Sequence, residues 1–198
     1  QSKEFIAYMS KNDLSFDSVI NKSIFETNPL LLNEKETKII EYAAFFGSNE
    51  IINYLINNGT ELRSNIWKYG IHSKDLDFIH YLENNHILPP DNKFESILKE
   101  SIKCHHINAS KYIVDNLINE ENLKFNNENN FYENIYRYSI EFYNYFFFPP
   151  DINHKYVFNY FCEFDYYTLV NLYLMNMKVN ETLNNILKYT FIIKFKIK

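Results

Sequence analysis

The pattern of apolar and polar residues is clearest in residues 42–62, YAAFFGSNEIINYLINNGTEL. Apolar side chains recur at helical spacing both before and after Gly47. Gly47 can adopt a positive φ at no steric cost, so we expect it to end one helix, and Ser48 to cap the next helix through its hydroxyl group. Asn58-Gly59 follows the second apolar run and predicts its end. The stretch therefore predicts a hairpin of two helices, which cannot bury its apolar face alone.

The same pattern recurs twice further along the chain. The small residue Ala43 corresponds to Gly70 and then to Ser101, and a second apolar run follows each of them. Recurrence of this kind is the sequence signature of a repeat protein, so we expect three repeats in residues 33–118. Trp67, the only tryptophan, occupies an apolar position of the repeat and is expected in the core.

The segment before the repeats is expected to form a helical cap over residues 1–32. Its better helix is predicted over residues 16–25, and Asn28-Pro29 is expected to interrupt the pattern. Asn33, with Glu36 three residues later, resembles a capping box, which predicts the start of the first repeat's helix. Before the third copy, prolines 89 and 90 exclude a helix, and Asp91 is expected to cap the helix that follows.

The C-terminal third of the chain shows the pattern more weakly. We expect an Asn-rich surface loop at residues 119–130, two degenerate repeats at residues 131–190 and a truncated tail at residues 191–198. The first degenerate repeat is predicted as an aromatic helix over residues 131–148. The second covers residues 156–176, where Asp165 takes the place of the turn glycine.

The repeat resembles an ankyrin repeat. The resemblance rests on the small pair Ala43-Ala44, on Gly47, on Glu50 and on the apolar run of residues 51–55. It implies an all-α protein, a solenoid of degenerate ankyrin-like helix-turn-helix repeats. The chain is similar to the divergent, aromatic- and Asn-rich ankyrin proteins of parasitic protists, in which such a block, a domain of uncharacterised function, precedes more regular ankyrin repeats.

The later copies depart from the family pattern. Lys74, His105 and Asp165 stand where the pattern has its turn glycine, and no copy opens with Thr-Pro-Leu-His. These differences put the loop geometry of the later copies in question, but they leave the helical spacing intact.

The resemblance implies a non-catalytic protein–protein interaction module that presents a concave surface. In ankyrin stacks the two residues before the turn glycine are exposed on that surface. Phe45 and Phe46 would then form an exposed apolar patch, unless they pack against residues 1–32. The alternative is a structural cap or spacer of a longer ankyrin array with no partner of its own. Carried over position by position, the protein-binding positions are Phe45, Phe46, His72, Ser73, Lys103, Cys104, Glu163 and Phe164.

Composition and charge narrow the range of partners. A protein that binds nucleic acid needs an excess of basic side chains to replace the counterions of the phosphates. The net charge of this chain is −5 over 198 residues, so we expect a protein partner and no nucleic acid. No run of about 18 apolar residues is present, which predicts no membrane insertion. The start of the chain lacks a signal peptide's apolar core. It also lacks Met, which indicates a fragment or a trimmed product.

The two cysteines, Cys104 and Cys162, are far apart and lack CxxC spacing. They are expected to be reduced thiols in a reducing compartment, which predicts an intracellular location, cytoplasmic or nuclear.

Candidate chemistry concentrates in Cys104-His105-His106. Adjacent histidines on a helix point about 100° apart, so both rarely serve one ion, and no second Cys/His cluster lies nearby. No GxGxxG, P-loop or HExxH motif is present. We therefore expect no catalytic residue, metal, cofactor or small-molecule substrate. A metal-binding or enzymatic protein that uses these three residues is the third alternative. His72, His80 and His86 are expected on the exposed surface.

Overall fold

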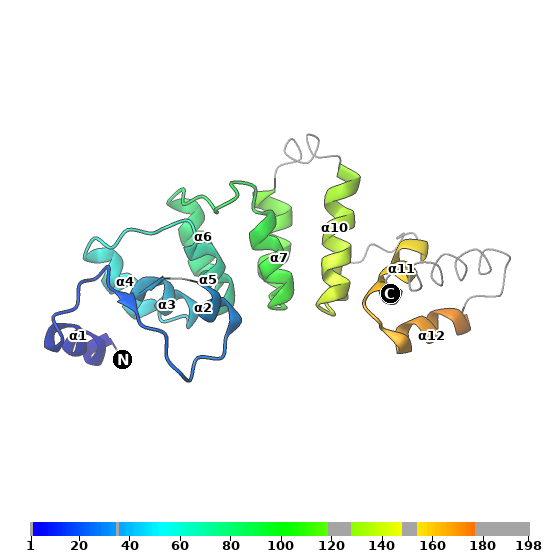
Figure 1. Ribbon diagram of the computed structural model, residues 1–198. Helices are drawn as coiled ribbons and strands as arrows, with labels where there is room; N and C mark the ends of the chain where they lie inside the picture. The colour runs from blue at the N-terminus through cyan, green and yellow to red at the C-terminus, as the bar shows by residue number, and fades with distance from the viewer. Residues whose placement is uncertain (1, 35, 119–127, 148–153, 177–198) are drawn as a thin grey trace. The chain divides into compact units, whose positions relative to one another are not determined.

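The computed structural model describes residues 2–34, 36–118, 128–147 and 154–176 (Figure 1). The described residues are mostly helical, in agreement with the predicted all-α class. The chain divides into two compact units, Gln1–Asn126 and Asn127–Lys198.

Three pairs of helices follow one another in the first unit, where the repeated pattern predicted helices. The third pair continues into a single π-helical turn, Ile113–Leu117. The pairs are α3 (Ile39–Phe45) with α4 (Asn49–Asn57), α5 (Ile66–Ser73) with α6 (Leu76–Asn84), and α7 (Glu95–Lys103) with α8 (Ile107–Tyr112).

The first helix of each pair ends in the same left-handed turn. Gly47 has a φ of 64°, as its position predicted, and Lys74 and His105 adopt φ values of 58° and 53° without being glycine. The turn is closed in the first pair by a hydrogen bond from Ser48 N to Ala43 O, and an equivalent bond closes the third pair. The turn therefore has the same left-handed backbone conformation with glycine, lysine or histidine at its centre.

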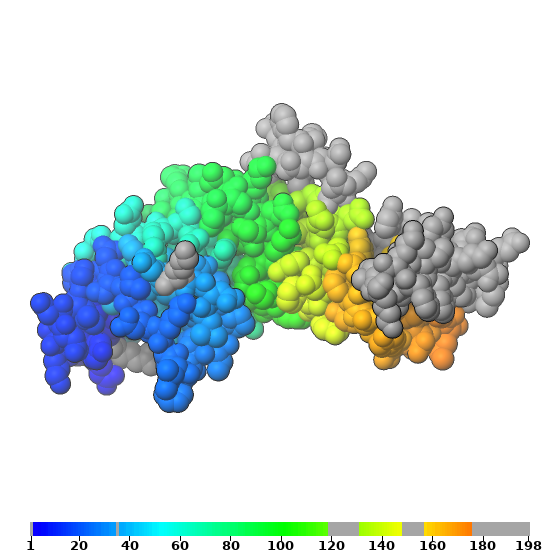
Figure 2. Space-filling model, in the orientation of Figure 1, coloured from blue at the N-terminus to red at the C-terminus, as the bar shows by residue number. Residues whose placement is uncertain are grey.

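The helices pack in chain order within this unit. The first helices lie side by side, α3 on α5 and α5 on α7, and each also packs on the second helix of its own pair. In the space-filling view, the atoms of this unit form a continuous surface without a visible gap (Figure 2). Gly70 allows a close approach of α6, because a Cβ atom there would lie 2.9 Å from the ring of Phe78. Trp67 is fully buried, as predicted, and its indole N–H donates to Ile87 O.

Residues 16–25 do not form the predicted helix. Val19–Ile20 forms a short strand, β1, which pairs antiparallel with β2 (Thr37–Lys38), so that Val19 lies opposite Lys38. Val and Ile are β-branched and favour extended backbone, and here the pairing outweighs the helical spacing of the apolar residues. Within the segment expected to form a helical cap, α1 (Ser2–Lys11) is helical and packs on α4.

Two predicted boundaries around the first repeat are wrong. Asn28-Pro29 begins a helix, α2 (Pro29–Asn33): the Asn28 side chain accepts a hydrogen bond from Leu30 N, and proline suits the first helical position. The capping box predicted at Asn33 is absent, because β2 holds the chain extended until α3 begins. The acidic cap of α3 is Glu41, whose carboxylate accepts from Lys38 N at 2.8 Å.

Side-chain capping of the later helices is also mixed. Ser48 occupies the N-cap position of α4, but its hydroxyl group makes no capping hydrogen bond. Asp91 does satisfy the start of α7, because its carboxylate accepts from Ser96 N at 2.8 Å. Asn58 and Gly59 end α4 as predicted, with a φ of 85° at the glycine.

The second unit contains α10 (Glu128–Glu141), a 3-10 turn at Tyr145–Phe147, α11 (His154–Glu163) and α12 (Tyr167–Asn176). Residues 128–130 are helical, so the predicted Asn-rich loop is too long at its end. The aromatic helix predicted to residue 148 ends at Glu141, because Tyr143 turns left-handed at a φ of 55°. Predictions for residues 119–127 and 177–198 lie outside the described residues.

A left-handed turn also joins the last two helices. Asp165 has a φ of 58° between α11 and α12, and Tyr166 N donates to Phe161 O. A small buried core of Ile140, Val157 and Tyr160 lies between α10 and α11. Asp165 therefore adopts the same left-handed conformation as Gly47.

Candidate functional site

The predicted protein-binding positions of the first unit lie at the C-terminal ends of α3, α5 and α7. Because these helices pack side by side and end in the same turn, predicted residues on successive helices become neighbours. The ring of Phe45 stacks on the imidazole of His72, with ring centroids 4.8 Å apart. His72 in turn contacts Cys104, whose Sγ lies 3.5 Å from Nε2. The fold thus joins residues from all three pairs in one row.

An exposed aromatic patch, formed by Tyr42, Phe45 and Phe46, lies at one end of this row. Phe46 is 57% exposed, whereas Phe45 and Tyr42 are half-buried. The Phe46 ring lies 4.9 Å from that of Tyr42 and 5.0 Å from that of Phe45. The aromatic side chains of the N-terminal segment contact Tyr54 of α4 instead, through Phe5 and Phe16.

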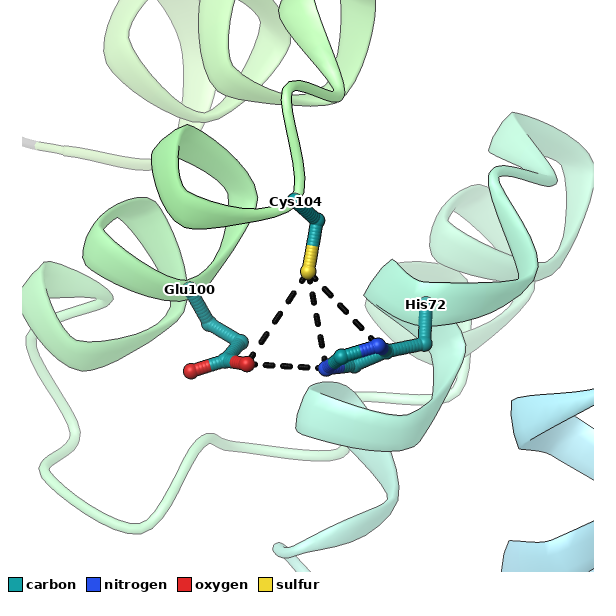
Figure 3. A group of neighbouring side chains, drawn as sticks. All are labelled: His72, Glu100 and Cys104. Carbon is teal, nitrogen blue, oxygen red and sulfur yellow. Dashed lines mark hydrogen bonds and ion pairs between the residues drawn. The ribbon is translucent and has the colours of Figure 1, made fainter. Parts of the chain in front are cut away.

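The centre of the row is a cluster of three side chains, His72, Glu100 and Cys104 (Figure 3). His72 comes from α5, and Glu100 lies on α7 one turn before Cys104, so both α7 side chains face α5. His72 Nε2 is 2.8 Å from Glu100 Oε1, and Cys104 Sγ is 3.9 Å from the same oxygen. The His72 side chain is only 14% exposed, which corrects the expectation that it lies on the exposed surface.

Burial and neighbouring groups shift the pKa of Glu100 and that of Cys104 in opposite directions. Burial by itself would raise the pKa of Glu100, but the hydrogen bond with His72 and the charge of Lys103 lower it overall. Burial and the neighbouring Glu100 carboxylate raise the pKa of Cys104 to about 12. At neutral pH the Cys104 side chain is therefore a thiol, which is a poor nucleophile in the absence of a metal.

Ser73 and Lys103 have more local partners. The Ser73 hydroxyl donates to Gly70 O at 2.6 Å and accepts from Asp75 N, so it completes the turn between α5 and α6. Lys103 is exposed, and its ammonium group lies 3.6 Å from Glu100 Oε1.

Cys104, His105 and His106 do not converge. His105 is the exposed left-handed turn residue, whereas His106 is buried. Burial lowers the pKa of His106, partly offset by a hydrogen bond with the Ile71 backbone. Within the described residues, the group with metal-ligating geometry contains Cys104 together with His72 and Glu100. Sequence reasoning missed Glu100, although its spacing from Cys104 places the two on one helical face.

The other predicted surface histidines are less buried than His72. His86 is exposed, at the left-handed end of α6. His80 is partly exposed, and its ring lies 4.4 Å from that of Tyr112.

The predicted positions of the second unit contact one of its own helices. Glu163 of α11 forms an ion pair with Arg137 of α10, and the Arg137 guanidinium lies 5.4 Å from the centre of the Phe164 ring. Glu163 is exposed and Phe164 is half-buried. Glu163 and the residue that follows α11, Phe164, therefore both contact α10.

Comparison with protein-family models, curated proteins and solved structures gave no match to this chain. Among the described helices, none combines the length and the apolar character that crossing a membrane requires.

Proposed function

We propose that this chain is a non-catalytic protein-interaction module built from stacked ankyrin-like repeats. Three observations support the repeat assignment: the serial helix pairs, the same left-handed turn after each first helix, and the packing of α3, α5 and α7 in order. A repeat stack presents a preformed surface, so a partner binds without a large cost of ordering the chain.

The observation that carries the proposal is the aromatic patch of Tyr42, Phe45 and Phe46. Contiguous exposed apolar patches mark interaction sites more often than single exposed side chains do, and aromatic residues anchor many interfaces. Phe46 is the anchor, because it is well exposed while its neighbours hold its ring in place. The partner is a protein that places an apolar side chain against this ring.

The test is affinity capture from the source cell with three purified baits. These are the unchanged chain, Phe46→Glu and the control Phe25→Glu, which alters a phenylalanine that is 83% exposed and lies outside the patch. A partner held by the unchanged chain and the control, and lost with Phe46→Glu, is the expected result. Retention by all three baits, or capture of nothing specific, would contradict the proposal.

A structural spacer within a longer array is the second candidate function. Leu172 and Met175 are exposed on α12, and a further repeat would cover such side chains. Capture of nothing by any of the three baits would favour this candidate over the first.

A further inference from the structure

The cluster of His72, Glu100 and Cys104 contains three different zinc-binding groups. An imidazole nitrogen, a carboxylate oxygen and a thiol sulfur lie within 4.8 Å of one another, and they come from two helices of successive pairs. We propose that these three side chains bind one Zn²⁺ ion. The proposal does not depend on the protein-binding function.

The distances between these atoms approach those of a tetrahedral zinc site. With Zn–S about 2.3 Å, and Zn–N and Zn–O about 2.0–2.2 Å, ligand atoms of a tetrahedron lie ~3.3–3.6 Å apart. Here sulfur and nitrogen are 3.5 Å apart, sulfur and oxygen 3.9 Å, and nitrogen and oxygen 2.8 Å. Two of the three distances therefore need to change by about half an ångström.

Binding also requires a turn of the imidazole ring. Cys104 Sγ is almost equally far from Nδ1 and Nε2 of His72, at 3.6 and 3.5 Å, so neither nitrogen points its lone pair at the sulfur. Rotation about the Cβ–Cγ bond of His72 directs Nε2 to the centre of the cluster. Phe45 stacks on this ring, so metal binding shifts a contact of the aromatic patch.

The charges of the ligands match a divalent cation. A Glu100 carboxylate, a Cys104 thiolate and a neutral imidazole together balance the two positive charges of Zn²⁺. The ion displaces the thiol proton to solvent as the Zn–S bond forms. Lys103 must move away from Glu100 Oε1, which its exposed side chain allows. Thiolate and imidazole favour zinc over magnesium and calcium.

The bound ion would connect α5 to α7 and so tie two successive helix pairs together. Three protein ligands leave one tetrahedral position for water or for a ligand from another molecule.

Zinc chloride and cobalt chloride, added to the reduced and chelator-treated chain, test this proposal. We expect calorimetry to show saturation at one zinc per chain, with release of about one proton at neutral pH. Cobalt should produce a thiolate-to-metal charge-transfer band. Weak, non-saturating binding, or saturation without that band, would overturn the proposal.

Single substitutions assign the ligands. Changing a residue that only supports a metal ligand weakens metal binding by up to ~100-fold. Cys104→Ser removes a ligand itself, so it should weaken zinc binding by at least ~100-fold. Two variants serve as controls. Cys162→Ser changes the other cysteine, and His105→Asn removes an imidazole while keeping a residue that tolerates the left-handed turn. Both variants should bind zinc as tightly as the unchanged chain does. Equal loss in His105→Asn, or full affinity in Cys104→Ser, would refute the ligand set. Circular dichroism shows whether each variant is folded. If a variant does not fold, the cobalt charge-transfer band of the unchanged chain tests whether a thiolate binds the metal.

Discussion

Glu41 is a charged residue that is only 1% exposed, and hydrogen bonds account for its burial. Arg63 donates to both carboxylate oxygens, from Nε at 3.1 Å and from Nη2 at 2.7 Å, and Lys38 N donates to one of them. A buried charge is tolerated only when it is paired and hydrogen-bonded in this way. The pair joins α3 to the loop before α5.

Removal of Arg63 tests this pairing. Arg63→Met should lower the free energy of unfolding by about 2–3 kcal/mol, because hydrogen bonds to charged groups contribute ~1.5–3 kcal/mol and the Glu41 carboxylate would stay buried. Urea denaturation measures the change. Lys99→Met, which breaks a partly exposed ion pair with Glu95, should cost less than about 1 kcal/mol. Equal costs in the two variants would contradict this account.

Residue-scale reasoning from sequence succeeds where the determinant is local. Gly47 takes a positive φ, and Trp67 is buried, because each prediction depended on the residue and its near neighbours. The contact of His72 with Cys104 could not be predicted, because it depends on how α5 packs against α7. Position-by-position equivalence pairs His72 with Lys103, whereas the predicted residue of the third pair in contact with His72 is Cys104, one position later.

At the scale of the element, helix ends determine the fold. Three first helices end in one type of turn, although only Gly47 is a glycine. A non-glycine residue in this conformation costs roughly 1–2 kcal/mol, so packing of the helices must outweigh that cost at Lys74 and His105.

Exchange of residues at these turns should change stability in opposite directions. Gly47→Ala should lower the free energy of unfolding by about 1–2 kcal/mol, whereas Lys74→Gly should raise it by up to about 1 kcal/mol. Thermal melting followed by circular dichroism measures both. Stabilisation by Gly47→Ala would show that the turn is not left-handed in solution.

Asp91 makes the start of α7 sensitive to acid. Burial would raise the pKa of Asp91, but hydrogen bonds from Ser96 and from the Lys93 backbone lower it overall, below its ordinary value of 3.8. A carboxyl group with a lowered pKa stabilises the fold above its unfolded pKa, and this contribution is lost as pH falls through the folded pKa. Asp91→Ala should therefore cost about 1–2 kcal/mol at neutral pH and progressively less below pH 3.8.

Urea denaturation across this pH range checks the Asp91 prediction. Asp115→Ala changes an exposed carboxylate and serves as the control. Its difference in free energy of unfolding from the unchanged chain should not shrink as the pH falls. A difference between Asp91→Ala and the unchanged chain that stays constant down to the most acidic sample would contradict the capping role.

Element boundaries were the least predictable feature of the sequence. Residues 16–25 have helical spacing, yet Val19–Ile20 pairs with Thr37–Lys38, because strand pairing is a contact between distant segments. The end of α10 was also missed. No glycine or proline marks it, and the left-handed residue is Tyr143.

At the scale of the whole molecule, each unit is organised around serial helices. Three predicted partner-facing positions of the first unit, Phe45, His72 and Cys104, form one row. In the second unit, Glu163 and Phe164 instead contact Arg137 of α10. The site proposed for protein binding therefore reduces to the aromatic patch of the first unit. Sequence alone could suggest Phe46, but its exposure depends on how residues 2–34 pack.

The most direct test of the proposed function is the affinity of a captured, purified partner for three chains: unchanged, Phe46→Glu and Phe25→Glu. Loss of a hot-spot aromatic costs 2 kcal/mol or more, so Phe46→Glu should bind at least ~30-fold more weakly. Phe25→Glu should stay within about twofold of the unchanged chain. Equal affinities of all three chains, or a loss confined to Phe25→Glu, would contradict a protein-binding site at the aromatic patch.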